Sequence, residues 1–294
     1  MSTRLILAHV AMFLVALIYA ANFSLAKMAM PHYVGAFGFI LLRVSAAAAL
    51  FFLSSAFIRE KVETKDIGTL VLTSIFGVAL NMLTFFKGLE LTTPINGALI
   101  MLMTPILVLV FSFVVLKEKL NFLKIIGIGL GLGGALMLTL SNSSASSAYA
   151  PDPLWGNILV GINAASYGVY LIMVKPLAKK YHPITIMKWN FGLGFIFVFP
   201  FGIQQTLEVN WQAMPYEIML VIAFVLFFVT FVNYLLNAIA LTMVSPAVVG
   251  AYIYLQPVLT ALIAIVGGHD SLTLTITISS LLIFGGVYLV SYKK

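Results

Sequence analysis

The sequence has few charged residues and no cysteine. Only 9% of its 294 residues are Asp, Glu, Lys or Arg, and 62% are hydrophobic, whereas a soluble domain carries about 25% charged residues. With a mean hydropathy of +1.11, the chain could not cover a water-exposed surface, so nuclear, cytosolic and secreted globular proteins are excluded. The absence of cysteine excludes disulfides, thiolate metal sites and cysteine nucleophiles.

The chain also lacks the motifs of intramembrane enzymes and ATP-driven pumps. It contains neither a Walker phosphate loop nor an HExxH zinc motif. Its four histidines and nine acidic residues fall in loops or near the ends of apolar runs, so no mid-membrane carboxylate is available to carry protons. We expect no enzyme activity, no metal and no cofactor, and facilitated diffusion or exchange rather than tight proton coupling.

Apolar runs long enough to cross a membrane recur along the whole chain. A bilayer core about 30 Å thick needs ~20 apolar residues per helix, and these runs are solidly apolar instead of alternating as porin strands do. The sequence therefore predicts an all-α integral membrane protein with ten transmembrane helices. We place them near Leu5–Ala26, Gly35–Ile58, Ile67–Lys87, Pro94–Leu116, Phe122–Leu140, Leu154–Val174, Ile184–Gly202, Tyr216–Ala238, Ser245–Val266 and Leu272–Tyr292.

The basic residues are distributed unevenly between the two predicted sides. Twelve of the 16 Lys and Arg residues lie on the side that holds both termini, and two lie on the other side. The positive-inside rule then places both termini in the cytoplasm of a multi-pass protein of the cell membrane, which we take to be a bacterial inner membrane. The net charge of +7 needs no nucleic acid to explain it, and the expected partners are the lipid bilayer and a small-molecule substrate.

The second half of the chain repeats the first in a constant register of 152 residues. The matched positions are Asn81 with Asn233, Pro94 with Pro246, Pro105 with Pro257, and Gly133-Gly134 with Gly285-Gly286. We therefore predict a first five-helix repeat over residues 1–141, an external Ser-rich linker over 142–153, and a second repeat over 154–294. Because each repeat has five spans, the second enters the membrane inverted relative to the first.

Inverted repeats are frequent in secondary transporters, where exchanging the two conformations opens a midplane site to alternate sides. The alternative is that duplication only built a stable bundle. A passive channel or facilitator is a further alternative, although no filter loop is present. An intramembrane enzyme is the least favoured, because its site residues are missing.

Three stretches of the sequence, two in the first half and one in the second, resemble a known family. The stretches that carry the resemblance are NMLTFFKGLELTTPINGALIMLMTPILVLVFSFVVLKEKLN (Asn81–Asn121), IGIGLGLGGALML (Ile126–Leu138) and NAIALTMVSPAVVGAYIYLQPVLTALIAIVGGHDSLT (Asn237–Thr273). Together they resemble the ten-helix EamA-type members of the drug/metabolite transporter superfamily. The resemblance implies export or exchange of small metabolites, often amino acids, by alternating access. Glu118 and Arg43 match family positions, whereas Gln256 replaces a frequent acidic residue.

Polar side chains inside the predicted spans are the candidate substrate contacts. They are Asn22, Arg43, Asn81, Tyr167, Asn233, Asn237, Tyr252 and Gln256. Arg43 lies ~12 Å deep, too deep to reach the interface easily. It could anchor an anion or carboxylate, or it could be a structural cation that joins helices. Each amide could likewise bind substrate or only connect two helices.

Two further features concern motion and packing. Pro105 and Pro257 lie within spans and should kink them, either as hinges for gating or as fixed bends. Glycines of the fifth span recur at small-xxx-small spacing, which allows a close approach between helices. We expect packing within the chain, and the sequence leaves both a monomer and a homodimer open.

Overall fold

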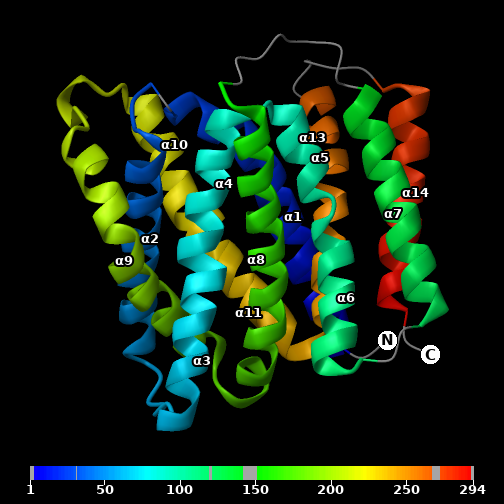
Figure 1. The fold of residues 1–294 in the computed structure, drawn as a ribbon, viewed down its shortest axis with the longest axis horizontal. Helices are drawn as coiled ribbons and strands as arrows, with labels where there is room; N and C mark the ends of the chain where they lie inside the picture. The colour runs from blue at the N-terminus through cyan, green and yellow to red at the C-terminus, as the bar shows by residue number, and fades with distance from the viewer. Residues whose placement is uncertain (1–2, 31, 119–120, 142–150, 267–271, 293–294) are drawn as a thin grey trace.

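The computed structural model describes residues 3–30, 32–118, 121–141, 151–266 and 272–292. Ten helical spans in this part of the chain are long and apolar enough to cross a membrane, and no strand occurs among the described residues (Figure 1). The predicted all-α membrane fold is therefore confirmed. Most of the Ser-rich linker and the loop around Asp270 lie outside the described residues.

Six spans are uninterrupted and four are broken. The single helices are α1 (Thr3–Ala29), α2 (Ala36–Ser55), α7 (Phe122–Ser141), α8 (Pro153–Lys180), α9 (Pro183–Leu207) and α14 (Leu274–Ser291). The third span comprises α3 (Thr64–Ser74), η1 (Ile75–Ala79) and α4 (Leu80–Leu91), and the fourth α5 (Pro94–Met101) and α6 (Thr104–Leu116). The eighth comprises α10 (Tyr216–Phe224), η3 (Val225–Val232) and α11 (Asn233–Met243), and the ninth α12 (Pro246–Ala251), η4 (Tyr252–Tyr254) and α13 (Leu255–Val266). The short turn η2 (Trp211–Ala213) precedes α10.

The interruptions fall at equivalent places in the two halves. The π-helical segments η1 and η3 overlap when the register of 152 residues is applied, and so do the breaks before α6 and within η4. Pro105 lies in the first turn of α6, and Pro257 is the third residue of α13. A proline is tolerated there because the first N–H groups of a helix have no helical partner. The predicted bends are thus present as helix breaks just before each proline.

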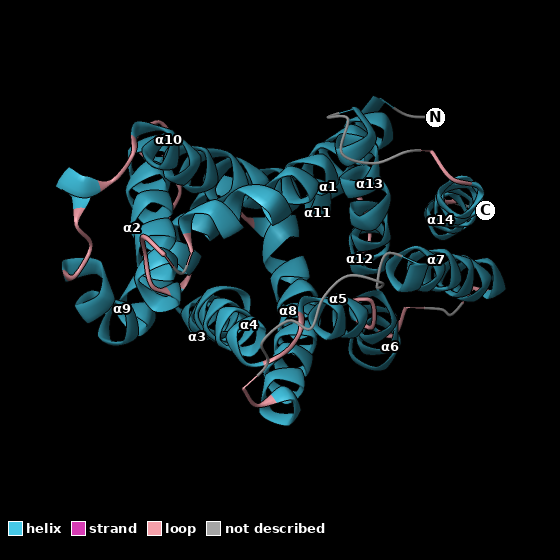
Figure 2. Ribbon diagram, turned by 90° about the horizontal axis from the view of Figure 1, so that it is seen from above, coloured by secondary structure: helices cyan, strands magenta, loops and turns pink. Residues whose placement is uncertain are grey.

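The two halves pack with a twofold pattern. Helix α2 packs on α9, and α7 packs on α14, so each of these pairs joins equivalent helices of the two halves. Figure 2 shows these pairs at opposite ends of the molecule. In the middle, the contact of α4 with α8 corresponds to that of α11 with α1. Helix α1 runs up from the lower face in Figure 1, whereas α8 runs down from the upper face, as an inverted repeat requires.

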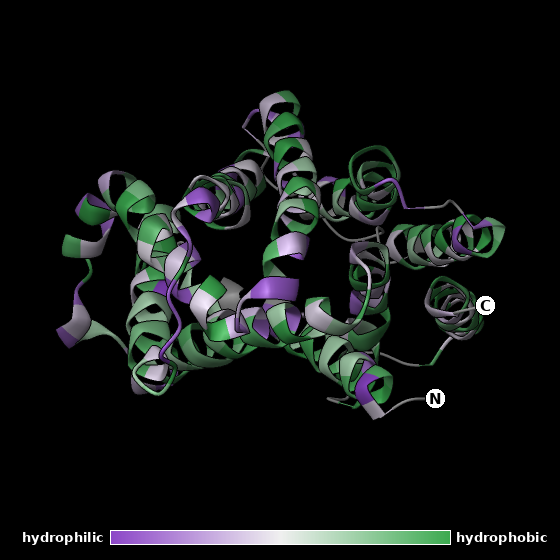
Figure 3. Ribbon diagram, turned by 90° about the horizontal axis from the view of Figure 1, so that it is seen from below, coloured by the Kyte–Doolittle hydropathy of each residue, from purple (hydrophilic) through white to green (hydrophobic). Residues whose placement is uncertain are grey.

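Apolar side chains cover the outside of this bundle, where lipid would lie. Many large hydrophobic residues are exposed, for example Phe57 at 92% and Val266 at 89%. Purple, hydrophilic segments are seen toward the centre of the view as well as at its margin (Figure 3), and Arg43, Asn163 and Asn233 are polar residues buried between helices. The fold therefore places its polar chemistry between the helices, at the contact of the two halves.

Glycines set the spacing of α7 and α14. A Cβ atom on Gly286 would lie 2.5 Å from the carbonyl oxygen of Gly127 and 2.7 Å from the backbone nitrogen of Gly131. A Cβ atom on the neighbouring Gly285 would meet nothing within 4 Å. The small residues therefore serve helix packing within the chain, on one face of each helix.

Gly286→Ala should destabilise the protein, and Gly285→Ala should not. The new methyl group at Gly286 collides with backbone, which cannot rotate away, so we expect a loss of ~1–3 kcal/mol. At Gly285 the same change only improves helix propensity, by about 1 kcal/mol or less. Thermal unfolding of both variants in detergent measures the difference, and equal midpoints would contradict this packing.

An ion-pair network joins the two halves at the lower face. Lys180, at the end of α8, contacts Glu63 Oε1 at 2.7 Å and Asp66 Oδ2 at 2.5 Å beside the start of α3. The Tyr181 hydroxyl donates to Asp66 Oδ2 at 2.6 Å and accepts from the backbone N–H of Glu63 at 3.0 Å. Hydrogen bonds from Lys180 and then Lys65 hold the pKa of the exposed Glu63 below its ordinary value.

This network should make stability sensitive to acid. The pKa of Glu63 is lowered in the folded protein. Its contribution to the free energy of unfolding is therefore complete above the ordinary carboxyl pKa, and it is lost as pH falls through the lowered pKa of the folded state. We expect Lys180→Gln to lower the unfolding midpoint at pH 7, and the difference from wild type to shrink below about pH 4. Unfolding scans from pH 7 to 3 test this; a difference that stays constant would refute it.

Candidate functional site

Buried and half-buried polar side chains gather at the centre of the bundle, from α1, α2, α8, η3 and α11. We call them the central polar cluster: Tyr19, Arg43, Tyr167, Tyr170, Thr230, Asn233, Tyr234 and Asn237. Four of the predicted candidates, Arg43, Tyr167, Asn233 and Asn237, belong to it. The first repeat supplies only two members, so the cluster spans the contact of the two halves.

Arg43 is the charged member of the cluster. It is the eighth of the 20 residues of α2 and is 5% exposed. Its Nε donates to Thr230 Oγ1 at 3.0 Å, and its guanidinium carbon lies 5.5 Å from the ring centre of Phe86. Placing such a charge at a helix centre costs about 2.5–3.5 kcal/mol on insertion scales, so its neighbours must offset that cost.

Tyrosines and amides form the rest of the cluster. The Tyr167 hydroxyl donates to Asn237 Oδ1 at 3.4 Å, and Asn237 Nδ2 donates to the carbonyl of Asn233 at 3.2 Å. The ring centres of Tyr167 and Tyr170 are 6.0 Å apart. Tyr19 lies beside Asn233 as well as Arg43. These groups offer hydroxyl and amide donors and acceptors next to aromatic surface.

The matched asparagines each face the first helix of the other repeat. Asn81 Nδ2 donates to the carbonyl of Asn163 at 3.3 Å, and Asn163 Nδ2 donates to the carbonyl of Asn81 at 2.7 Å. Asn233 Nδ2 donates to the carbonyl of Val15 in α1 at 3.5 Å. Asn81 therefore connects α4 to α8, and Asn233 connects α11 to α1, as the twofold pattern requires.

The π-helical segments lie directly before these asparagines. A π-helical segment frees backbone carbonyls, which need other partners in a membrane. The Ser166 hydroxyl of α8 donates to the carbonyl of Phe76 in η1 at 2.6 Å. In η3, the hydroxyl of Thr230 donates to the carbonyl of Val225 at 3.0 Å. Since Thr230 also accepts from Arg43, it links the segment η3 to the charged group.

A second polar group lies at the break of the ninth span. His9 Nδ1 and the Tyr252 hydroxyl are 2.8 Å apart, and His9 Nε2 is buried without a hydrogen-bond partner. Gln256, one helical turn further on, is half-buried, and its backbone carbonyl accepts from the Thr260 hydroxyl at 2.9 Å. The candidates Tyr252 and Gln256 are thus placed at the helix break.

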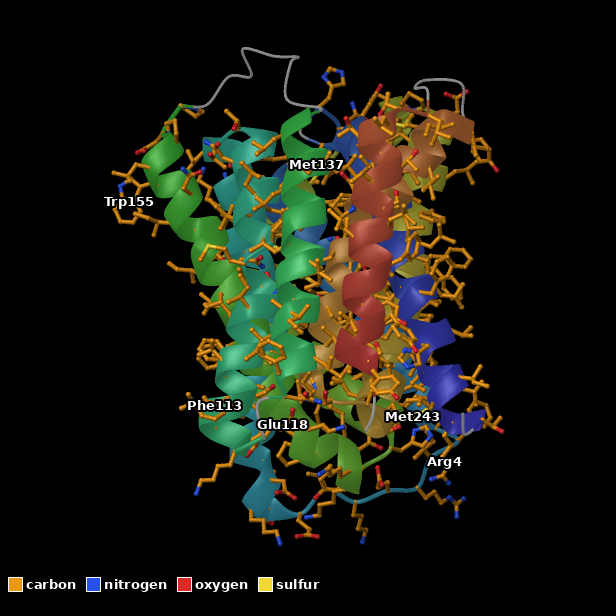
Figure 4. The ribbon with its side chains drawn as sticks, turned by 90° about the vertical axis from the view of Figure 1, so that its right-hand side faces the viewer. Arg4, Phe113, Glu118, Met137, Trp155 and Met243 are labelled. Atoms are coloured by element: carbon orange, nitrogen blue, oxygen red, sulfur yellow. The ribbon has the colours of Figure 1, made fainter. Side chains whose placement is uncertain are left out.

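A cavity of ≈ 360 Å³ opens at the lower face beneath this group. Its wall includes Leu5 and Val248, each one helical turn below the His9–Tyr252 contact, and the partners Glu118 and Lys124, which are 3.5 Å apart. Figure 4 labels Glu118 and Met243 at this face, opposite Trp155 and Met137. The His9–Tyr252 contact is thus separated from the cavity wall by about one turn of α1 and of the ninth span, at Leu5 and Val248.

Sequence reasoning missed part of this arrangement. The sequence marks Tyr19 only as one of several polar side chains within spans, and it does not mark Thr230 or Tyr234, although Tyr234 directly follows a repeat-matched asparagine. His9 was set aside as a residue near a span end, yet it lies within α1 and contacts the broken helix. Asn22 is half-buried in α1, with its Oδ1 atom buried and unpartnered in the described structure.

These features define a class: a polytopic helical membrane protein of two inverted halves, with broken helices and polar groups at their contact. The model of the EamA-like transporter family matches the chain twice, over residues 6–140 and 154–292. The chain belongs to this family, and its fold is that of a membrane transporter.

Known relatives agree with this assignment. The "Uncharacterized transporter YetK" of Bacillus subtilis is 23% identical over 230 residues, covering 78% of this chain and 69% of the relative. An "Uncharacterized transporter" of Archaeoglobus fulgidus is 24% identical over 237 residues, covering 80% of this chain and 81% of the relative. A solved crystal structure shares the fold, with a TM-score of 0.76 and 17% sequence identity. The match covers 96% of this chain and 95% of the chain in that structure. Both of the sequence relatives, from B. subtilis and A. fulgidus, are named as transporters.

Tyr252→Phe should destabilise the protein more than Tyr254→Phe. The first change removes the partner of His9 Nδ1, at a cost of ~1–3 kcal/mol. The second removes a buried hydroxyl that has no hydrogen-bond partner in the described structure, so its loss should be neutral or slightly stabilising. Thermal unfolding of the two variants decides this, and an equal or larger loss for Tyr254→Phe would count against the contact.

Proposed function

We propose that the protein is a secondary transporter that moves a small metabolite, an amino acid or a similar polar or amphipathic organic solute, by alternating access between its two repeats. Net export or exchange is the proposed mode. The observation that carries the proposal is that the π-helical segments η1 and η3, at repeat-matched positions, both adjoin the central polar cluster, η1 through Gly77 against Tyr170 and η3 through Thr230. Discontinuous helices beside a midplane site are a recurring feature of inverted-repeat transporters.

The central polar cluster is the proposed solute site. Arg43, Tyr167, Asn233 and Asn237 would contact the solute directly, with Asn22 and Asn81 beside them. Tyr252 and Gln256 would act closer to the lower-face cavity. Pro105 and Pro257 would allow the fourth and ninth spans to bend at the preceding breaks, because no helical hydrogen bond crosses a proline nitrogen.

The proposed orientation has the lower face, with both termini, in the cytoplasm of a bacterial inner membrane. Residues 142–153 would form an outside linker between repeats 1–141 and 154–294. The distribution of basic residues supports this orientation. The cysteine-free chain allows a direct test, since single cysteines at Ser143 and Ser271 should label from outside and one at Thr64 only from inside.

Transport itself is tested by counterflow in proteoliposomes with labelled amino acids, organic acids, sugars and nucleosides. A carrier should show saturable uptake that is stimulated by solute on the opposite side. A passive channel would give flux that does not saturate, and that result would contradict the proposal.

Alternating access is tested with cysteines on opposite faces. Val248 is 7% exposed and lines the lower-face cavity, and Met214, beside the upper end of α10, is 6% exposed. We expect Val248→Cys to react faster than Met214→Cys, and a transported solute that slows the first to accelerate the second. Tyr216→Cys, at a position 72% exposed, is the control and should not respond. Changes of the same sign at both positions would exclude reciprocal opening.

A further inference from the structure

The charge of Arg43 has no negative partner in the part of the protein that the structure describes. None of the ion pairs there includes it. Among the described residues its one hydrogen bond runs from Nε to Thr230 Oγ1, which leaves four of the five guanidinium N–H donors for another group. Buried charges in proteins are normally paired, and no described residue pairs with this one.

The neighbours of Arg43 are neutral. Tyr19 and Tyr234 lie close enough to interact electrostatically with it, Thr230 accepts its hydrogen bond, and Phe86 offers a ring face. Hydroxyl oxygens and a ring face lower the cost of the buried cation without cancelling its charge. The centre of the bundle is therefore positive and can hold an anion.

The groups around the guanidinium suit an anion that is part of an organic molecule. Asn233, which is fully buried, has an unpartnered Oδ1 atom in the described structure. The Tyr234 ring packs edge-on against Phe191, with ring centres 4.9 Å apart. The surroundings thus combine an amide acceptor and aromatic surface with the cation.

We propose that Arg43 binds the anionic group of the transported solute, a carboxylate or a phosphate, through its free N–H donors. The hydroxyls of Tyr19 and Tyr234 complete the contacts, and the neighbouring rings hold the apolar part. This inference rests on the proposed transport function. Because Arg43 is 5% exposed here, the solute enters when the two repeats separate around the cluster, and its charge then neutralises the cation.

The test uses the full-length protein in detergent and a polar metabolite extract in three forms: mock-treated, phosphatase-treated, and carboxylate-capped by amidation. Thermal unfolding reports binding, because a ligand of the folded state raises the midpoint. We expect the mock-treated extract to stabilise the wild type. Phosphatase abolishes the shift if the group is a phosphate monoester, and capping abolishes it if the group is a carboxylate.

Three variants assign the effect to the guanidinium. Arg43→Gln should weaken binding about tenfold or more, because charge-assisted hydrogen bonds are lost. Arg43→Lys keeps the charge but not the planar fork, so it should give an intermediate shift, and it carries the test if Arg43→Gln does not fold. Lys188→Gln removes a cation of α9 that lies 6.0 Å from the Phe52 ring, and it should behave as wild type.

The outcomes separate the two proposals. A shift that survives both treatments of the extract, or that persists unchanged in Arg43→Gln, overturns the anion site and leaves transport standing. If no form of the extract stabilises the wild type and counterflow shows no exchange, the transport function itself fails, and the anion site fails with it.

Discussion

Inside a bilayer, a backbone carbonyl that loses its helical partner must find another partner within the protein. Four of the ten spans here are interrupted, and the structure meets this demand with side chains. The Ser166 hydroxyl donates a hydrogen bond to the backbone carbonyl of Phe76 in η1, and the Thr230 hydroxyl donates one to that of Val225 in η3. Lys175 donates to the carbonyls of Leu241 and Val244, where α11 ends. The positions of these polar side chains follow from where the helices break.

This demand also couples the two repeats. Ser166 and Lys175 both lie on α8, in the second repeat. Lys175 donates to carbonyls of its own repeat, whereas the carbonyl that accepts from Ser166 belongs to the first repeat. Asn81 and Asn163 exchange hydrogen bonds across the same contact. The two halves are therefore joined in the middle by a few specific hydrogen bonds, and at one end by the close packing of α7 on α14, where backbone meets backbone at Gly127 and Gly286.

Sequence patterns predict the parts of this structure that depend on composition and repetition. The fifth span, expected at Phe122–Leu140, is observed as Phe122–Ser141, because hydropathy and length determine a span. The π-helical segments were not predicted, since Val225–Val232 is as apolar as a regular helix and a π turn depends on packing. Likewise, the contact of His9 with Tyr252 joins residues 243 positions apart, and no local pattern reveals it.

The repeat is symmetric in its backbone but not in its chemistry, and the difference falls at the centre. At the register of 152 residues, Thr230 corresponds to Val78, which has no hydroxyl to satisfy a carbonyl or to accept from a cation. In the first repeat, Ser166 from the other repeat meets the need of η1, so Val78 can stay apolar and pack against Gly194. In the second repeat, the Thr230 hydroxyl donates to the carbonyl of Val225 within the same π-helical segment, and its oxygen also accepts from Arg43 Nε. A scaffold that is symmetric in its backbone thereby holds the Arg43 cation on one side of its axis, because only the second repeat offers a hydroxyl at this position.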